Sequence, residues 1–367
     1  MPVKFAIVGA GNGGQALAGY LGWLGYEVRL YDAFQEVVSI INDRGGILLE
    51  GESPCFGKLA FASTNIRQVL AGADLVMVVN PSIYHRQIAE HCAPHLKQNQ
   101  VVFLHPGGTF GALAFKKALL DYGCPYEIPI AESSSLIYAC RALEPGRVLI
   151  GGKKDRLLVS TLPATANETL RSLLLNAFPE IQMARNVLVT SFDNTNPIFH
   201  PAPTLFSASW VESGKDFLYY YEGISETIGK FIVAMDQERL SIGKAIGLEL
   251  GTEIIDVFTQ YQVEYHTTGG SISDVVRHVP AYAAIYGPKT LRTRYIYEDV
   301  PMGLVPLVSL GKAVNQPAAK MELIISLAEQ LLGEDFTVTG RNLVNLGLKD
   351  LSVSQIVHYA ETGDKTV

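Results

Sequence analysis

Short apolar runs separated by longer mixed stretches fill the first half of the chain. The runs that predict strands are residues 3–8, 27–32, 74–80 and 101–105. Val, Ile and Leu fill them almost without interruption, which is typical of parallel strands covered on both faces. The intervening stretches are long enough for crossover helices, so the pattern predicts a doubly wound α/β sheet. A stretch between residues 46 and 61 breaks this pattern and predicts an inserted hairpin.

The apolar positions change to a helical period after about residue 190. Apolar residues within 228–235 recur at i, i+3, i+4 and i+7, and Ser225 before them is a suitable N-cap. Residues 321–332 repeat this spacing. We therefore expect an all-helical second domain, and we assign residues 1–188 to the first domain and 189–367 to the second.

Composition and charge narrow the class of protein. The 367 residues are 48% hydrophobic and 18% charged, which is globular composition for about two domains. The net charge of −7, without a dense Lys/Arg run, argues against a nucleic-acid or anionic-membrane partner. No apolar run approaches the ~18 residues of a membrane span. The four widely spaced cysteines lack a CxxC pair, which favours free thiols in the cytoplasm.

Three histidines lie close together in the first domain, at His85, His91 and His95. No carboxylate or thiol set completes a metal site around them, so we expect no metal. We interpret the stretch as a solvent-facing helix.

A glycine-rich turn follows the first strand. Gly9, Gly11 and Gly14 form G-x-G-x-x-G at the start of a predicted helix. The first glycine permits the tight turn, the second lets the backbone approach a pyrophosphate, and the third lets the helix pack closely. With Asn12 and Gly13 they predict a dinucleotide site at a helix N-terminus; the alternative is an ordinary turn.

An acidic residue lies where a ribose would bind. Asp32 ends the second strand, 18 residues after Gly14. Its carboxylate is placed to accept from both ribose hydroxyls of NAD. No cation directly follows it, so an NADP 2′-phosphate would meet negative charge and NAD is favoured. Arg29 leaves the NADP alternative open.

Two further strand ends belong to the same predicted sheet edge. They carry Asn80-Pro81 and Pro106-Gly107. We predict that both line the cofactor crevice, where a glycine lets a flat nicotinamide lie close. Ordinary turn chemistry explains each of them equally well. Gly151-Gly152 lacks the rest of a phosphate-binding loop and is interpreted as a turn.

The start of the helical domain carries a candidate proton-transfer pair. Asn196 and His200 share a face at i, i+4, with Pro197 in the first turn of the helix. Imidazole titrates near pH 7, which suits acid–base catalysis. Spacing alone favours the alternative, a structural histidine.

A second constellation lies within residues 292–300. Arg294 suits bidentate binding of a carboxylate, and Asp299 suits the orientation of an imidazole. The alternative is a solvated charged face. Tyr219-Tyr220-Tyr221 is interpreted as core and pocket wall.

Several motifs together resemble the opine dehydrogenases across nearly the whole chain. They are residues 9–14, 106–108, 132–134, 196–201, 220–224, 293–295, 298–300 and 303–307. The resemblance implies a Rossmann-type N-terminal domain and an all-α C-terminal domain of the 6-phosphogluconate dehydrogenase type, with the active site between them. It implies NADH-dependent reductive condensation of a 2-oxo acid, typically pyruvate, with the amino group of an L-amino acid.

The same resemblance assigns roles to individual residues. It makes His200 the acid/base and Asp299 its partner, and it places Asn196 beside the reacting carbon. Arg294 would hold the 2-oxo acid carboxylate. His105 departs from the family pattern, and we expect it to alter the nicotinamide pocket.

Other functions remain open at this point. One is a simple 2-oxo acid reductase of the same superfamily, and another is a nucleotide-binding sensor without catalysis. The expected partners are the two small-molecule substrates, and a homodimer stays open beside a monomer.

Overall fold

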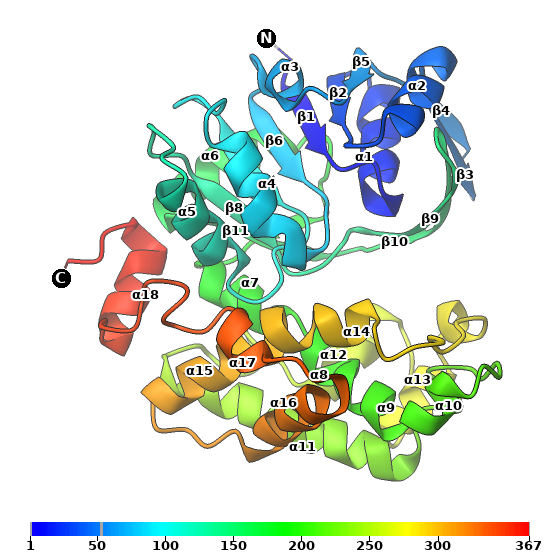
Figure 1. Cartoon of the computed structure of the whole chain (residues 1–367), viewed down its shortest axis with the longest axis vertical. Helices are drawn as coiled ribbons and strands as arrows, with labels where there is room; N and C mark the ends of the chain where they lie inside the picture. Colours follow the sequence, from blue (N-terminus) through cyan, green and yellow to red (C-terminus); the bar gives the residue numbers. More distant parts are fainter. Residues whose placement is uncertain (1, 52–53, 367) are drawn as a thin grey trace. The chain divides into compact units, whose positions relative to one another are not determined.

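The computed structural model describes residues 2–51 and 54–366, and the chain divides into two compact units (Figure 1). Unit 1 comprises Met1–Thr190 together with His358–Thr366, and unit 2 comprises Ser191–Val357. The boundary lies within α7 (Val187–Asp193).

An eight-stranded sheet forms the centre of unit 1, in the order β12-β11-β8-β7-β6-β1-β2-β5. Its strands are β1 (Lys4–Val8), β2 (Glu27–Tyr31), β5 (Phe61–Ser63), β6 (Leu75–Val78), β7 (Val101–Leu104), β8 (Ile130–Ser133), β11 (Leu157–Leu162) and β12 (Ile181–Met183). The six strands from β5 to β8 are parallel, and β11 is antiparallel to β8. The four predicted strands are confirmed as β1, β2, β6 and β7. The strand order reverses at β1, which is the point where doubly wound sheets bind dinucleotides.

Helices connect the parallel strands of unit 1. They are α1 (Asn12–Trp23), α2 (Gln35–Arg44), α3 (Ile66–Leu70), α4 (His85–Cys92), α5 (Gly111–Asp121) and α6 (Asn167–Leu174), with short turns η1 (Ser82–Tyr84) and η2 (Ala164–Ala166). The prediction of a solvent-facing α4 is wrong for His85, whose ring is buried against Phe115, although His91 is exposed. The described residues contain no group of three or more His, Cys, Asp or Glu side chains able to hold a metal ion.

A second, four-stranded sheet has the order β4-β3-β10-β9. Its strands are β3 (Gly46–Gly51), β4 (Cys55–Lys58), β9 (Tyr138–Glu144) and β10 (Arg147–Lys153). The antiparallel pair β3–β4 confirms the inserted hairpin, but its second strand ends at Lys58, and Phe61 begins β5 of the large sheet. Part of the connecting turn, residues 52–53, lies outside the described residues. Gly151-Gly152 is not a turn, because both glycines belong to β10, next to a register shift.

Unit 2 is helical. Its elements are α8 (Asn196–Phe199), α9 (Pro201–Phe206), α10 (Ala208–Glu212), α11 (Glu226–Ala245), α12 (Val257–Glu264), α13 (Ile272–Arg277), η3 (Pro280–Tyr282), α14 (Arg294–Tyr297), the π-helical η4 (Val300–Leu304), α15 (Val305–Ala313), α16 (Ala319–Leu332) and α17 (Phe336–Thr339). The Ser225 hydroxyl accepts from the Ile228 N–H and caps α11, as predicted. α16 ends at Gly333 in the left-handed conformation.

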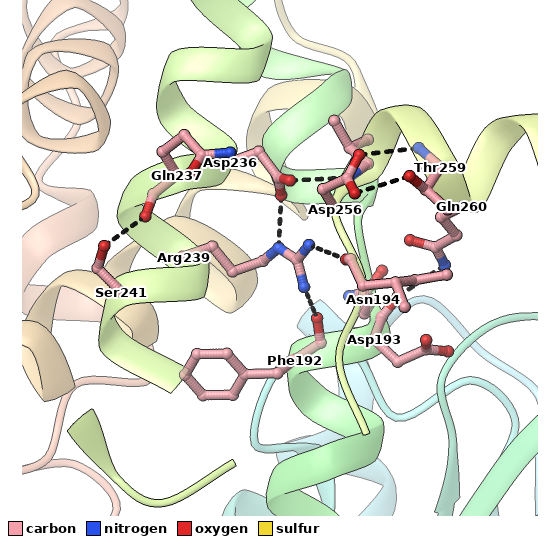
Figure 2. A network of polar contacts seen from close by, with 12 residues as sticks. Phe192, Asp193, Asn194, Asp236, Gln237, Arg239, Ser241, Asp256, Thr259 and Gln260 are labelled. Atoms are coloured by element: carbon pink, nitrogen blue, oxygen red, sulfur yellow. Dashed lines mark hydrogen bonds and ion pairs between the residues drawn. The ribbon is translucent and has the colours of Figure 1, made fainter. Parts of the chain in front are cut away.

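A buried ion pair fixes the start of unit 2 (Figure 2). Arg239 and Asp236 of α11 are both fully buried and form an ion pair. The guanidinium also donates to the carbonyls of Phe192 and Ile255, while Asp236 accepts from the Val257 N–H at 2.7 Å. These contacts satisfy two charges that would otherwise be costly to bury. They hold the end of α7 and the start of α12 against α11.

The last helix, α18 (Val353–Thr362), ends in unit 1. There Asn186 donates to Glu361 at 3.4 Å, and Tyr359 is buried. The assignment of all of residues 189–367 to the second domain differs from this division, because the apolar face of a helix does not say which unit it packs against.

Candidate active site

The glycine-rich turn joins β1 to α1 in unit 1. Gly9 has φ +104°, and a side chain there would meet the Asn80 amide 2.5 Å away. A side chain at Gly14 would meet the Gly9 carbonyl, so the helix packs closely on the turn, as predicted. Around Gly11, the N-cap of α1, a side chain would meet nothing within 4 Å, and no side chain caps the helix. The backbone N–H groups at this end are therefore suited to bind a phosphate.

Two polar side chains near this turn form hydrogen bonds to the backbone of unit 1. Asn12 accepts from the Ala142 N–H at 2.9 Å, so its side chain ties α1 to β9. Buried Gln15 donates to the Ala10 carbonyl at 2.7 Å and accepts from the Gly146 N–H at 2.7 Å. Gln15 was not predicted as a structural residue, although a glutamine on the apolar face of α1 indicates a buried polar contact.

Asp32 lies at the end of β2, next to the glycine-rich turn. Its Oδ2 accepts from the Ala10 N–H at 2.8 Å, and its Oδ1 accepts from the Phe34 N–H at 3.0 Å. These bonds orient a partly exposed carboxylate at the place where a ribose is expected. Arg29 is held by Glu27 and donates to a backbone carbonyl, so its guanidinium is engaged elsewhere. The arrangement favours NAD over a cofactor with a 2′-phosphate.

The ends of β6 and β7 contribute the other predicted cofactor residues. Asn80 lies over Gly9, and among the described residues its buried Oδ1 has no hydrogen-bond partner. A bound cofactor would satisfy this oxygen. Pro81 is exposed and precedes η1. The Pro106-Gly107 turn packs on the end of β8, where the Gly107 N–H donates to the Ser133 carbonyl at 3.1 Å.

The His105 side chain is buried inside unit 1. Its Nδ1 is 2.8 Å from the Ser133 hydroxyl, and its Nε2 accepts from the Ile137 N–H at 3.2 Å. Burial lowers the pKa of His105 to about 3, so the ring stays neutral. The two nitrogens therefore tie the end of β7 to the end of β8 and to Ile137, directly before β9.

Glu132, on β8, lies in one of the family motifs, but no role was predicted for it from the sequence. It is fully buried and accepts from the Ala112 N–H at 2.6 Å and the Thr190 hydroxyl at 2.7 Å. The first bond places a carboxylate at the N-terminus of α5, where the helix dipole favours it. The second holds α7 at the end of unit 1.

The candidate catalytic pair lies in unit 2. His200 follows α8 and Asp299 precedes η4, and both are buried. The structure brings them together, with His200 Nδ1 2.8 Å from Asp299 Oδ2. An ionised carboxylate only accepts, so the neutral imidazole carries its proton on Nδ1 and leaves the Nε2 lone pair for chemistry. This is the geometry of a histidine that moves a proton.

Tyrosine rings surround the pair. The Tyr295 ring lies 4.4 Å from the His200 ring, and Tyr219 stacks on Tyr295 at 4.9 Å. The Tyr219 hydroxyl donates to the His200 carbonyl at 2.8 Å. On the other side, the Tyr220 hydroxyl is 3.3 Å from His200 Nε2. Their interpretation as core and pocket wall missed the direct contact of Tyr220 with the histidine.

Arg294 begins α14, five residues before Asp299. Burial opposes its charge, but Asp299 and Glu298 outweigh that and raise the pKa of the guanidinium. The residue as a whole still reaches solvent, and within residues 2–51 and 54–366 no hydrogen bond or ion pair occupies its guanidinium; the centroid of the Tyr295 ring lies 5.9 Å from Cζ. A free guanidinium of this kind can bind a carboxylate with two parallel hydrogen bonds.

Asn196 lies at the first position of α8, four residues before His200 as predicted. Its backbone N–H donates to Asn194 and its carbonyl accepts from the His200 N–H. Its half-buried side-chain amide makes no hydrogen bond to the part of the chain that the structure describes. The amide is therefore available to a substrate.

Comparisons with known proteins agree with this geometry. Residues 183–332 match the model of the NAD/NADP octopine/nopaline dehydrogenase α-helical domain, and residues 4–109 match the NAD-dependent glycerol-3-phosphate dehydrogenase N-terminus. An opine dehydrogenase of Arthrobacter sp. (strain 1C) is 37% identical over 96% of this chain and 97% of its own. The chain belongs to the opine dehydrogenase family. It is therefore an NAD-dependent oxidoreductase of the kind that acts on CH–NH bonds.

More distant relatives share the whole architecture of this enzyme. The octopine dehydrogenase of Mizuhopecten yessoensis is 24% identical over 93% of this chain and 92% of its own. A solved octopine dehydrogenase in complex with NADH and agmatine has a TM-score of 0.78 at 20% identity, and covers 100% of this chain and 99% of its own. The predicted fold class, a Rossmann-type domain plus an all-α domain, is confirmed.

Proposed function

We propose that the enzyme condenses a 2-oxo acid, with pyruvate as the expected substrate, with the amino group of an L-amino acid. NADH then reduces the imine to an N-(carboxyalkyl) amino acid. The observation that carries the proposal is the buried His200–Asp299 pair, with Arg294, whose guanidinium has no hydrogen-bond partner among the described residues, close to it in sequence. Solved octopine dehydrogenases named as complexes of NADH with pyruvate or with L-arginine support the two-substrate reaction.

His200 has two proton transfers to perform. The amino acid must lose a proton before it attacks, because only the neutral amine has a lone pair. Nε2 of His200 takes that proton, and Asp299 stabilises the resulting imidazolium through Nδ1–H. The imidazolium then returns the proton to the carbinolamine hydroxyl, which leaves as water and gives the protonated imine (iminium), the species that accepts the hydride.

Arg294 and Asn196 position the substrates. We assign the carboxylate of the 2-oxo acid to the Arg294 guanidinium, since its donors are free among the described residues. The Asn196 amide, one helical turn before His200, can hydrogen-bond a group on the reacting carbon. Fixing the 2-oxo acid in this way lowers the entropic part of the barrier.

The cofactor residues belong to unit 1. We assign NAD(H) to the glycine-rich turn, the two later strand ends and Asp32, which together are Gly9, Gly11, Asn12, Gly13, Gly14, Asp32, Asn80, Pro81, Pro106 and Gly107. The backbone N–H groups before α1 would hold the pyrophosphate and Asp32 the ribose. Bound NADH supplies the hydride.

The deciding experiment follows NADH oxidation with pyruvate fixed and L-amino acids varied. The proposal expects turnover only when both the 2-oxo acid and an amine are present. Oxidation with pyruvate alone would instead indicate a simple 2-oxo acid reductase. Binding of NADH without turnover on any pair would indicate a sensor that has lost catalysis.

A cytoplasmic location is a further part of the proposal, and a homodimer stays open beside a monomer. The four cysteines are free thiols, which suits a reducing compartment. No helix in the described part of the chain is long and apolar enough to cross a membrane. Cell fractionation tests the location, and light scattering on the purified enzyme distinguishes a dimer from a monomer.

A further inference from the structure

Both nitrogens of the candidate catalytic histidine have a protein partner. Asp299 Oδ2 lies 2.8 Å from Nδ1 of His200, and the Tyr220 hydroxyl lies 3.3 Å from Nε2. The chemistry assigned to His200 needs the Nε2 lone pair. The Tyr220 hydroxyl therefore contacts Nε2, the atom that must take a proton from the substrate.

The direction of this second hydrogen bond follows from the partners. Burial raises the pKa of Tyr220 well above its ordinary value, so the phenol keeps its proton. Asp299 fixes the imidazole proton on Nδ1, which leaves Nε2 as an acceptor. In its contact with Nε2, Tyr220 is therefore the donor; the Tyr295 hydroxyl is a second hydrogen-bond partner of the same phenol.

Packing fixes the place of the Tyr220 hydroxyl. Its ring stacks on Tyr282 with centroids 3.8 Å apart and planes at 10°, and Phe199 lies 5.9 Å away. Tyr220 is only 5% exposed. The hydroxyl is therefore held toward the imidazole by the surrounding rings, independently of the hydrogen bond.

We propose that Tyr220 is a positioning residue for His200, an inference that rests on the proposed function. It orients the imidazole from the side opposite Asp299 and covers the Nε2 lone pair until an ammonium group displaces it. A separation of 3.3 Å is long for a hydrogen bond, which makes the contact easy to exchange.

The hydroxyl also serves the second half of the proton cycle. When the ammonium N–H bond breaks and the Nε2–H bond of His200 forms, the Tyr220 oxygen can accept from the new N–H. Tyr220 keeps its own proton throughout, so no charge is left on the phenol. One hydroxyl can thus partner the histidine in both of its protonation states.

The kinetic test compares Tyr220→Phe with the matched control Tyr282→Phe. Each variant removes one buried tyrosine hydroxyl from the same ring stack, but the Tyr282 hydroxyl donates to Tyr265 at 2.8 Å and makes no contact with His200. Loss of one hydrogen bond predicts a fall in kcat of about 2- to 13-fold for Tyr220→Phe. The KM for NADH should not move, and Tyr282→Phe should stay within about twofold of wild type.

A spectroscopic test needs no turnover. In protein labelled with ¹⁵N-histidine, His200 is assigned from the signal that disappears in His200→Gln. We expect an Nδ1–H tautomer in wild type. The Nε2 resonance should move downfield in Tyr220→Phe, because its hydrogen-bond donor is lost, and should stay in place in Tyr282→Phe. Melting temperatures of the two variants show that both are folded.

The outcomes separate this inference from the proposed function. If wild type shows no amine-dependent turnover, the proposed function fails, while the Nε2 resonance still decides whether Tyr220 holds the ring. An unchanged Nε2 resonance in Tyr220→Phe overturns the inference. Equal losses of kcat in Tyr220→Phe and Tyr282→Phe overturn it as well, because the effect would then be one of packing.

Discussion

Replacing Asp299 with asparagine separates proton transfer from substrate binding. Asparagine has nearly the same shape, and its carbonyl can still accept from His200 Nδ1–H across the observed 2.8 Å. What it cannot supply is a negative charge beside the imidazolium that forms when His200 takes a proton. The variant should therefore leave the ground state nearly intact and destabilise the protonated intermediate.

The size of this effect follows from the burial of the pair. The side chains of His200 and Asp299 are 6% and 10% exposed, so little water replaces the lost charge. A hydrogen bond to a charged group is worth about 1–2 kcal/mol more than a neutral one. We therefore expect kcat to fall about 5- to 30-fold in Asp299→Asn.

The pyruvate KM gives the control within the same experiment. Asp299 raises the pKa of Arg294 by its charge, and the same charge repels an incoming carboxylate. Removing it should lower the KM for pyruvate or leave it unchanged while kcat falls. Steady-state kinetics with each substrate varied in turn measure both quantities. A raised pyruvate KM with normal kcat would refute the assigned role and make Asp299 part of the binding site.

Three further substitutions or comparisons test other residues of the site. His200→Ala should lower kcat about 10²–10⁴-fold with NADH binding nearly intact, and near-normal turnover would make this histidine structural. Arg294→Lys should reduce kcat/KM for pyruvate about 10- to 150-fold, because one charge-assisted hydrogen bond is lost, and should change the KM for NADH little. A loss of kcat/KM for the amino acid alone would instead assign Arg294 to the amino-acid site. NADH should exceed NADPH in kcat/KM by at least about tenfold, because Asp32 repels a 2′-phosphate and Arg29 is held by Glu27; equal values would contradict that reading of Asp32.

The sequence predicted the features of the fold that depend on neighbouring residues. Buried parallel strands such as β1 and β6 are continuous apolar runs, and the turn at Gly9 needs a positive φ that glycine provides. The cap at Ser225 is also local. These signals need no knowledge of distant parts of the chain.

Two strands of the small sheet, β9 and β10, were not predicted. β9 and β10 mix apolar, charged and glycine residues, since one face of each is exposed, so their pattern is weaker than that of a buried strand. Gly151 and Gly152 have turn-forming composition, yet pairing with β9 keeps them in a strand. At these two glycines, pairing with a neighbouring strand determined the secondary structure, and the local amino-acid composition did not.

In the candidate site, too, local features were predicted from the sequence and long-range contacts were not. Spacing placed Asn196 one turn before His200, but only the family resemblance paired His200 with Asp299, 99 residues away. The partners of His105, Ser133 at the end of β8 and Ile137 before β9, were not predicted either, because they lie 28 and 32 residues away in sequence. Long-range contacts of this kind leave no mark in local sequence.

In the proposed reaction, one turnover joins two substrates and delivers hydride to the carbon that joins them. Mass spectrometry of the product formed from pyruvate, an accepted L-amino acid and NADH deuterated at the transferred position tests it most directly. We expect a single product containing both carbon skeletons, with deuterium on the former 2-oxo carbon and a nitrogen bonded to it. Deuterated lactate, with the amino acid recovered unchanged, would contradict it.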